Sequence, residues 1–374
     1  MKKLNYDKER LAQARDLRLR WYNGEKVDCV PFDFNVTSDE SKTWINTVAF
    51  NYREMIGDSA KVVEFFMRSM QRHLSAFPDC DFLPCFNTYY FGEGILASMY
   101  GAEQYVVEDQ PPFTKGRFFK DIYDAQRIHN DFDVDKTEWG AMLREHAQRF
   151  VEATDGEIPV GVADYQSPYG TATKLVPNEE LMLAMYDAPE LVHNLLSVVT
   201  DGIIKLIGAM ERWVGPECLA RNVANPIPGE CGVILWDDYV SVLNPALHTE
   251  FCAPWNKKLF AHFGKGHLHT CGPYFPSYID ACLACEPRSI DVAIMRDQSK
   301  TREDLVKFAE IARAHNILPL GWLGINDHHF MVGGSRPPDE ELLALYVKAG
   351  HLPTAWGSYE DGLKFKETVR RLSL

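Results

Sequence analysis

The chain has 374 residues, and its share of hydrophobic residues (46%) and charged residues (25%) is that of ordinary globular proteins. Its formal net charge of −14 argues against the phosphate backbone of a nucleic acid as a partner. No stretch approaches about 18 uncharged apolar residues, and no apolar segment follows the amino-terminal lysines. We therefore expect no membrane span, no signal peptide and a cytoplasmic location. In such a chain the nine cysteines are expected to be reduced thiols.

A polar stretch with helical rhythm, residues 7–22, precedes the first predicted strand at residues 26–35. Asp33 and Asn35 alternate there with two phenylalanines, so the two polar side chains are predicted to share one face of the strand. That face is either the mouth of a barrel, where both residues would bind substrate, or a solvated strand edge.

The second predicted strand, residues 81–86, leads into an aromatic loop that contains Tyr90 and, between two glycines, Glu93. Glycines let a backbone bend close to a ligand, so Glu93 is a candidate catalytic group and Tyr90 a candidate substrate contact. A simple turn is the alternative. Residues 100–137 are loop-like, and a connection of that length is typical of a lid or a partner-docking surface.

The third predicted strand, residues 158–165, ends in polar residues. We interpret Asp164 as a candidate catalytic carboxyl group and Gln166 as a candidate substrate-binding residue. The fourth, residues 217–223, is followed by a loop rich in turn residues. In that loop Asn225 is predicted to bind substrate, and Cys231 to be a further metal ligand.

Residues 266–272 form the most informative stretch, a short strand that ends at a Gly-Pro turn. Alternation places His267, His269 and Cys271 on one side of it. Imidazole nitrogen and thiolate sulfur are the ligands that zinc prefers, so His269 and Cys271 are candidate zinc ligands. The residues alone leave open an equal alternative, a core cysteine beside histidines that bond backbone carbonyls. The pair Cys282 and Cys285 on the next helix is more consistent with packing than with a redox or zinc site.

Three more strands are predicted at residues 289–294, 317–323 and 352–357. The loop after the second of them holds His328, which either binds a ligand or lies on the surface. Eight strands that alternate with helices predict an α/β fold, a single (β/α)8 TIM barrel over residues 1–374 with an N-terminal helical extension. A doubly wound open sheet is the rival, but the chain has no G-x-G-x-x-G or P-loop motif. Active sites of such barrels lie at the carboxyl ends of the strands, where Asp164, Asn225, His269 and Cys271 are predicted to lie.

Four segments, taken in their order, resemble the uroporphyrinogen decarboxylase superfamily: residues 27–34, 164–168, 187–192 and 269–272. Within it they are most similar to the zinc-dependent, corrinoid-linked methyltransferase branch, and the resemblance runs from about residue 27 to the carboxyl terminus. It implies a barrel whose His269 and Cys271 bind zinc.

The resemblance also implies an enzyme that moves a methyl group between a methyl-corrinoid, free or on a partner corrinoid protein, and a small-molecule donor or acceptor. Zinc would lower the pKa of a bound thiol, which makes the thiolate available near neutral pH. A homodimer is a further expectation.

The chain departs from the superfamily in two places. Decarboxylases of the superfamily use an arginine-rich amino-terminal segment with an aspartate, and residues 30–35 contain no arginine, which argues against a decarboxylase. Members that methylate thiols supply another cysteine near the last strand, whereas Cys285 is the last cysteine here. The remaining zinc ligand is then Glu93, Glu230, Cys231 or His328, or the chain is a metal-free binding protein on the same fold.

Overall fold

The computed structural model describes residues 3–36, 51–76, 82–270, 278–292, 301–322, 340–348, 350, 352–357 and 359–373. The strands are β1 (Asp33–Val36), β2 (Gln104–Tyr105), β3 (Phe113–Thr114), β4 (Val160–Gly161), β5 (Leu219–Ala220), β6 (Val233–Trp236), β7 (Gly266–Thr270), β8 (Ser289–Val292), β9 (Leu318–Trp322) and β10 (Leu352–Gly357).

The helices are α1 (Lys8–Tyr22), α2 (Tyr52–Ile56), α3 (Ser59–Ala76), α4 (Ile95–Met99), α5 (Glu138–Thr154), α6 (Pro168–Leu175), α7 (Asn178–Asp187), α8 (Pro189–Val214), α9 (Pro245–Leu247), α10 (Ala253–Phe263), α11 (Ile279–Leu283), α12 (Thr301–Ala314), α13 (Glu340–Lys348) and α14 (Tyr359–Ser373). Short 3₁₀ turns form η1 (Tyr89–Phe91), η2 (Asp124–Arg127), η3 (Val134–Lys136) and η4 (Asp238–Ser241), and a π-helical turn forms η5 (His248–Cys252).

Six strands form one parallel sheet in the order β1-β10-β9-β8-β7-β6, so the first and the last of these strands along the chain are neighbours in space. Backbone bonds continue the arc from β6: Ile234 N donates to Arg221 O, just after β5, and β5 pairs with β4. A parallel bridge between Phe86 and Val160 adds the segment before η1. The predicted α/β fold is confirmed, whereas the described residues record no pairing that closes the ring between Phe86 and β1.

The prediction missed strand β6. Only 12 residues and no helix separate it from β5, so the expected alternation of strand and helix does not apply there. All four of its residues, Val-Ile-Leu-Trp, are buried between β5 and β7.

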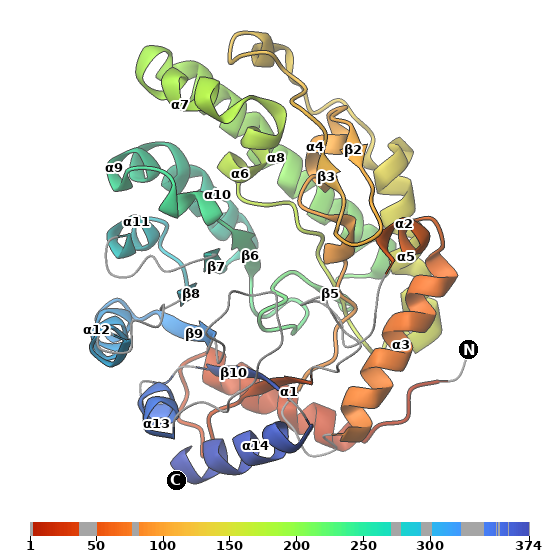
Figure 1. Cartoon of the computed structure of the whole chain (residues 1–374), viewed down its shortest axis with the longest axis vertical. Coiled ribbons are helices and arrows are strands. Elements are labelled where there is room, and N and C mark those ends of the chain that lie inside the picture. Colours follow the sequence, from red (N-terminus) through yellow and green to blue (C-terminus); the bar gives the residue numbers. More distant parts are fainter. Residues whose placement is uncertain are drawn as a thin grey trace.

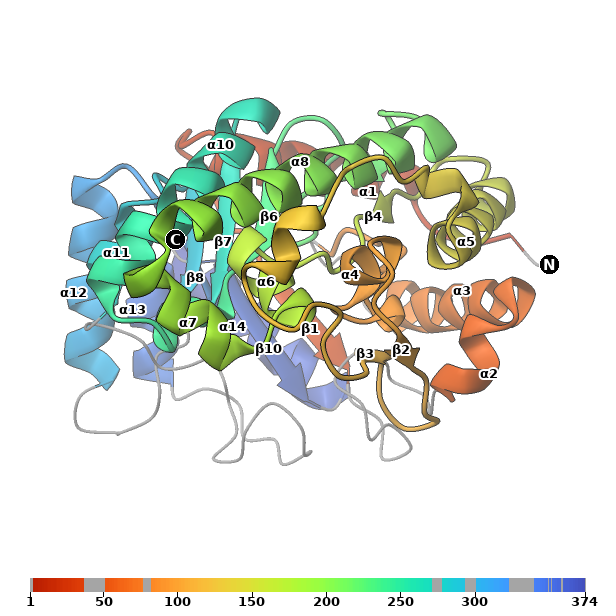
Figure 2. The same cartoon turned by 90° about the horizontal axis from the view of Figure 1, so that it is seen from above.

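Helices lie outside the arc of strands, and Figure 1 shows them around its rim. Figure 2 shows β6, β7 and β8 side by side, with α10, α11 and α12 flanking them. Helix α8 is long and apolar enough to cross a membrane by length and composition, but half of its most apolar window is buried inside the protein. It packs against α5, α6, α7 and α10.

The amino-terminal helical extension is confirmed as α1, whose first turn is capped by the Asp7 side chain. Trp21 and Tyr22 at its end pack with Leu83, Ile227, Cys231 and Leu352, which precede or begin strands. Arg18 is 1% exposed, donates to the carbonyl oxygen of Phe32 at 3.2 Å and forms an ion pair with Asp33. Helix α1 therefore covers the amino ends of the strands, and the opposite ends are the place for a site.

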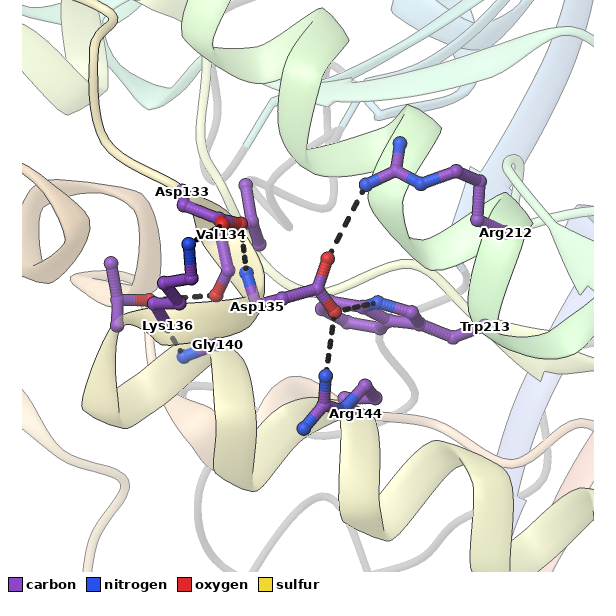
Figure 3. A network of polar contacts seen from close by, with 9 residues as sticks. Asp133, Val134, Asp135, Lys136, Gly140, Arg144, Arg212 and Trp213 are labelled. Atoms are coloured by element: carbon purple, nitrogen blue, oxygen red, sulfur yellow. Dashed lines mark hydrogen bonds and ion pairs between the residues drawn. The ribbon is translucent and has the colours of Figure 1, made fainter.

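The excursion at residues 100–137 contains the antiparallel β2–β3 hairpin and the turns η2 and η3. Figure 3 shows how its last turn is fastened: Asp135 accepts hydrogen bonds from Arg144 of α5 at 2.9 Å and from the indole of Trp213 of α8 at 2.7 Å. Arg212 adds an ion pair to the same carboxylate at 3.5 Å. This end of the excursion is therefore held to α5 and α8, and a role as a lid or a partner-docking surface stays a prediction.

Candidate active site

A histidine and an aspartate meet near the carboxyl ends of β7 and β8. The register pairs His269 with Asp291, and His269 Nδ1 donates to Asp291 Oδ2 at 2.6 Å. The backbone N–H of Thr270 donates to the other oxygen of Asp291 at 3.1 Å. His269 is 8% exposed and Asp291 is 2% exposed, so both side chains are largely shielded from solvent.

Asp291 is held in its charged form. Burial opposes its ionisation, but the charge and hydrogen bond of His269, with the charge of the nearby His267, outweigh burial and hold the pKa of Asp291 well below its ordinary value. His267, fully buried, places Nδ1 2.9 Å from the Ser289 hydroxyl and Nε2 3.7 Å from Asp291. Both histidines thus reach one carboxylate, as the predicted alternation along this strand requires.

Asp164 and Gln166 come together just after β4, as predicted. Gln166 Nε2 donates to Asp164 Oδ1 at 2.7 Å, and Gln166 adopts a left-handed φ of +61°, which is costly for a residue with a Cβ atom. The next residue, Ser167, caps helix α6 and binds through its N–H to the Trp236 carbonyl oxygen at 2.9 Å. The hydrogen bonds of Gln166 and Ser167 therefore hold this turn, and they fix the position of the Asp164 carboxyl group.

Asp164 is the group in this region whose charge state changes near neutral pH. Burial raises its pKa to about 7, and the negative charges of Glu93 and Asp238 add to that shift. The hydrogen bond from Gln166 and the charge of His269 act in the opposite direction. Asp164 therefore lies within the electrostatic range of His269, and it exchanges a proton readily at physiological pH.

Glu93 lies near Asp164 but is engaged by a cation. Its Oε1 is 2.5 Å from Lys174 Nζ on α6. The glycines on either side serve packing of the loop: Gly92 has φ of +75°, and an added Cβ atom would lie 2.0 Å from the Pro112 carbonyl oxygen. Glu93 therefore influences the charge of Asp164, and the structure gives it a partner of its own.

Tyr90 does not line the site, contrary to the prediction. It is fully buried, its hydroxyl lies 2.8 Å from His146 Nδ1, and its ring packs against Phe86 and Phe91. The neighbouring Tyr89 takes its place. Its ring meets Trp236 edge to face at 5.1 Å, and burial followed by the charge of Asp164 raises its pKa well above the ordinary value.

Asp33 and Asn225 each have a partner within the protein. Asp33 is the first residue of β1 and is paired with Arg18 of α1. Asn225 is fully buried and places Nδ2 3.1 Å from Cys231 Sγ. Substrate binding by Asp33 and Asn225 stays a prediction.

Cys231 is out of reach of a metal ion at His269. The register sets Trp236 beside His269, and Val233 already stands three residues before Trp236, about 10 Å along the strand. Cys231 lies beyond Val233, whereas zinc binds ligands at about 2.0–2.3 Å. Burial also raises the pKa of Cys231 to about 12, which makes it an unreactive thiol. Cys271, His328 and the side chain of Asn35 lie outside the described residues.

Sequence reasoning overlooked Asp291, Tyr89 and Trp236. A carboxylate between the apolar residues Ile290 and Val292 was the one available signal for Asp291, because charged groups inside strands are rarely left unpaired. Nothing in the sequence distinguishes Tyr89 from Tyr90.

A fully buried polar cluster backs the end of β6. His248 Nε2 donates to Asp237 Oδ2 at 2.8 Å, and Asn256 Nδ2 donates to the same oxygen at 2.6 Å. With Cys285, the Asp237 and His248 side chains could hold a metal ion, because their ligand atoms lie within 4.8 Å of one another. The backbone N–H of Asp237 donates to the His269 carbonyl oxygen at 2.9 Å, so this cluster adjoins the strand that carries the site.

Comparisons with known proteins found curated relatives of similar sequence and a solved structure of similar fold. Uroporphyrinogen decarboxylases of Xanthomonas campestris and Xanthomonas axonopodis are each 26% identical over 173 residues, 44% of this chain. The chain resembles the uroporphyrinogen decarboxylase superfamily. The match spans 43% of the length of these curated relatives. No family model matches the chain.

One solved structure is similar in fold over nearly the whole chain. A methyltransferase from Methanosarcina mazei superposes with a TM-score of 0.67 at 14% identity, over 96% of this chain and 99% of the other. At that identity the match establishes the shared fold alone.

Proposed function

We propose that this protein is a methyltransferase that moves a methyl group between a corrinoid and a small-molecule donor or acceptor, at a zinc site in a closed (β/α)8 barrel. The observation that carries the proposal is the His269–Asp291 pair near the carboxyl ends of β7 and β8. The likeness in fold to a methyltransferase and the matches to decarboxylases support an enzyme on this scaffold.

The donor set near His269 suits zinc. Its Nδ1 is committed to Asp291, which directs Nε2 as the nitrogen that would bind the metal, and a carboxylate on the other ring nitrogen is the usual support of a zinc-bound histidine. Cys271 would supply the thiolate. When bound, the zinc would lower the pKa of a thiol or hydroxyl on the acceptor.

Asp164 would then handle the proton. A carboxyl group with a pKa of about 7 accepts the proton that an acceptor thiol or hydroxyl gives up as it takes the methyl group. Gln166 fixes its orientation through the 2.7 Å hydrogen bond, and the Glu93–Lys174 pair adjusts its charge. Tyr89 and Trp236 supply aromatic surface beside it, against which an apolar part of the substrate would pack.

The test is an incubation with zinc, methylcobalamin and a panel of acceptors: a thiol, a phenol, an amine and a folate. We expect the absorbance of the methyl–cobalt bond to fall with one of them. No change with any of them, in protein that contains zinc, would contradict the proposal. Elemental analysis beforehand separates the enzyme from a metal-free binding protein on the same fold, which would contain no zinc.

Decarboxylation of a uroporphyrinogen-type substrate is the second candidate, because the curated relatives bear that name. The arginine that reaches the first strand is Arg18, but it is buried and paired with Asp33 at the covered ends of the strands. It offers no charge to the carboxylates of a tetrapyrrole at the open ends. Turnover of uroporphyrinogen at a rate above that of methyl transfer would favour this candidate.

A further inference from the structure

The cluster behind β6 consists of four buried side chains from separate elements, and we name it the Asp237 cluster: Asp237, His248, Asn256 and Cys285. Asp237 follows β6, His248 begins the π-helical turn η5, Asn256 lies on α10 and Cys285 follows α11. All four side chains are fully buried. Three potential metal ligands and an amide thus meet where water does not reach.

We propose that the Asp237 cluster is a second metal site, structural in role, that takes zinc or a similarly soft divalent cation. Asp237 Oδ2, His248 Nε2 and Cys285 Sγ would be ligands, and they lie within 4.8 Å of one another. Bonds of about 2.0–2.3 Å around a tetrahedral zinc set ligand atoms roughly 3.3–3.8 Å apart. The cluster therefore reaches that geometry through shifts of about 1 Å, an opening of the 2.8 Å contact between His248 and Asp237 and a closing of the wider separations.

A second observation points to something that this cluster binds. Among the described residues, Asn256 Oδ1 and His248 Nδ1 are buried and have no hydrogen-bond partner. Buried polar atoms normally have one, because an unmet hydrogen bond costs about 1–3 kcal/mol. A cation held by His248 Nε2 would not reach Nδ1 of the same ring, so the Asn256 oxygen is the atom that indicates a ligand in this cluster.

Asn256 offers the fourth ligand. Its Nδ2 lies 2.6 Å from Asp237 Oδ2 and 3.5 Å from Cys285 Sγ, at the centre of the cluster. A half-turn of the amide exchanges nitrogen and oxygen, and the two orientations have nearly the same shape. It would bring the unpartnered Oδ1 toward Asp237 and Cys285, where a cation would take the place of the lost N–H contacts.

The charges select the kind of ion. One carboxylate and one thiolate balance a divalent cation in a buried site, and binding releases the thiol proton of Cys285 to solvent. Imidazole and thiolate favour zinc and disfavour magnesium or calcium, which prefer oxygen ligands. The metal would join the end of β6 to α10 and α11, and through the Asp237 N–H it would steady the strand of His269.

The experiment starts from a Cys271→Ser variant, which removes a thiol expected at the first site, and measures metal per chain after purification with zinc. We expect one equivalent in Cys271→Ser, and none once Cys285→Ser is added. The matched control adds Cys282→Ser, a buried cysteine three positions away that is not a ligand, and keeps the equivalent. Absence of metal from Cys271→Ser, or its retention with Cys285→Ser, would overturn the proposal.

A measurement with cobalt(II) distinguishes the absence of the metal site from the failure of a variant to fold. Cobalt(II) in place of zinc gives a thiolate-to-metal charge-transfer absorption, and we expect it in the folded Cys271→Ser protein, where Cys285 is the ligand. Folded Cys271→Ser protein without that absorption refutes the site. Methyl transfer is a separate readout, so loss of this site and failure of the proposed function are distinguishable.

Discussion

His269 and Asp291 stand opposite each other on neighbouring parallel strands, and a 2.6 Å hydrogen bond joins His269 Nδ1 to Asp291 Oδ2. Asp291 is ionised because the two histidines on β7 outweigh its burial and lower its pKa. A negative group at this position both orients the imidazole and makes it a stronger ligand. The proposed metal chemistry depends on this pair.

Asp291→Asn should keep the fold and weaken metal binding about 10–100-fold, because the ring of His269 loses the carboxylate that orients it. The measurement is zinc affinity by competition with a chelator. Asp280→Asn is the matched control, since Asp280 is an exposed aspartate on α11. Equal affinity in both variants would show that Asp291 does not support a ligand.

Asp164→Asn should lower the rate of methyl transfer by about 10²–10⁴, because the group that takes the proton is gone. In the unchanged protein the rate should rise with pH through about 7, as Asp164 loses its proton. That limb should be missing from the pH profile of the variant. A variant whose profile keeps the limb would assign it to another group.

Asp164 should also make stability depend on pH. Its folded pKa of about 7 lies above the unfolded value of about 3.9, so the folded state binds more protons between these values and stability falls as pH rises through this window. Asp164→Asn removes that loss. At pH 8 the free energy of unfolding in urea should therefore be about 1–3 kcal/mol higher for the variant than for the unchanged protein. Identical slopes of stability against pH in both proteins would contradict the burial of this carboxyl group.

Substitutions of Glu93 and Lys174 should shift the pH profile of the methyl-transfer rate in opposite directions. Glu93→Gln removes a negative charge that raises the pKa of Asp164, so the limb near pH 7 should shift to lower pH. Lys174→Met leaves the charge of Glu93 without its partner and should shift the limb to higher pH. Glu103→Gln, on the exposed surface, is the control that should change nothing.

Substitutions of the adjacent residues Tyr89 and Tyr90 should distinguish a residue needed for packing from one that contacts substrate. Tyr90→Phe leaves His146 Nδ1 without its buried partner and should cost about 1–3 kcal/mol of unfolding free energy, with KM unchanged. Tyr89→Leu should raise KM with a smaller effect on stability, because its ring lies beside Trp236 near Asp164. Denaturant melts and steady-state kinetics on both variants measure these effects, and a raised KM in Tyr90→Phe would reverse the assignment.

The sequence predicted what depends on local periodicity. Two-residue alternation placed His267 and His269 on one side of a strand, and both contact Asp291. The four short segments indicated a resemblance to the uroporphyrinogen decarboxylase superfamily, and the matches to curated decarboxylases agree with that resemblance.

Contacts between residues that are far apart in the sequence could not be predicted from local periodicity or short motifs. Asp291 meets His269 only through the register of β8 against β7, and Arg18 meets Asp33 only because α1 folds under the strands. Cys231 was placed at the wrong end because β6, which follows it directly, was not recognised as a strand. Tyr89 and Tyr90 differ by one position in a 3₁₀ turn, where periodicity over so few residues does not assign a face.

The most direct test of the central claim follows methyl–cobalt absorbance over time with zinc-loaded protein and its preferred acceptor, in the unchanged chain, in His269→Gln and in His262→Gln. His262 is an exposed histidine near the end of α10 and serves as the matched control. The account predicts that the unchanged chain and His262→Gln consume the methyl–cobalt bond while His269→Gln, folded as judged by its thermal melt, does not. Equal rates in all three proteins would contradict a metal site at His269.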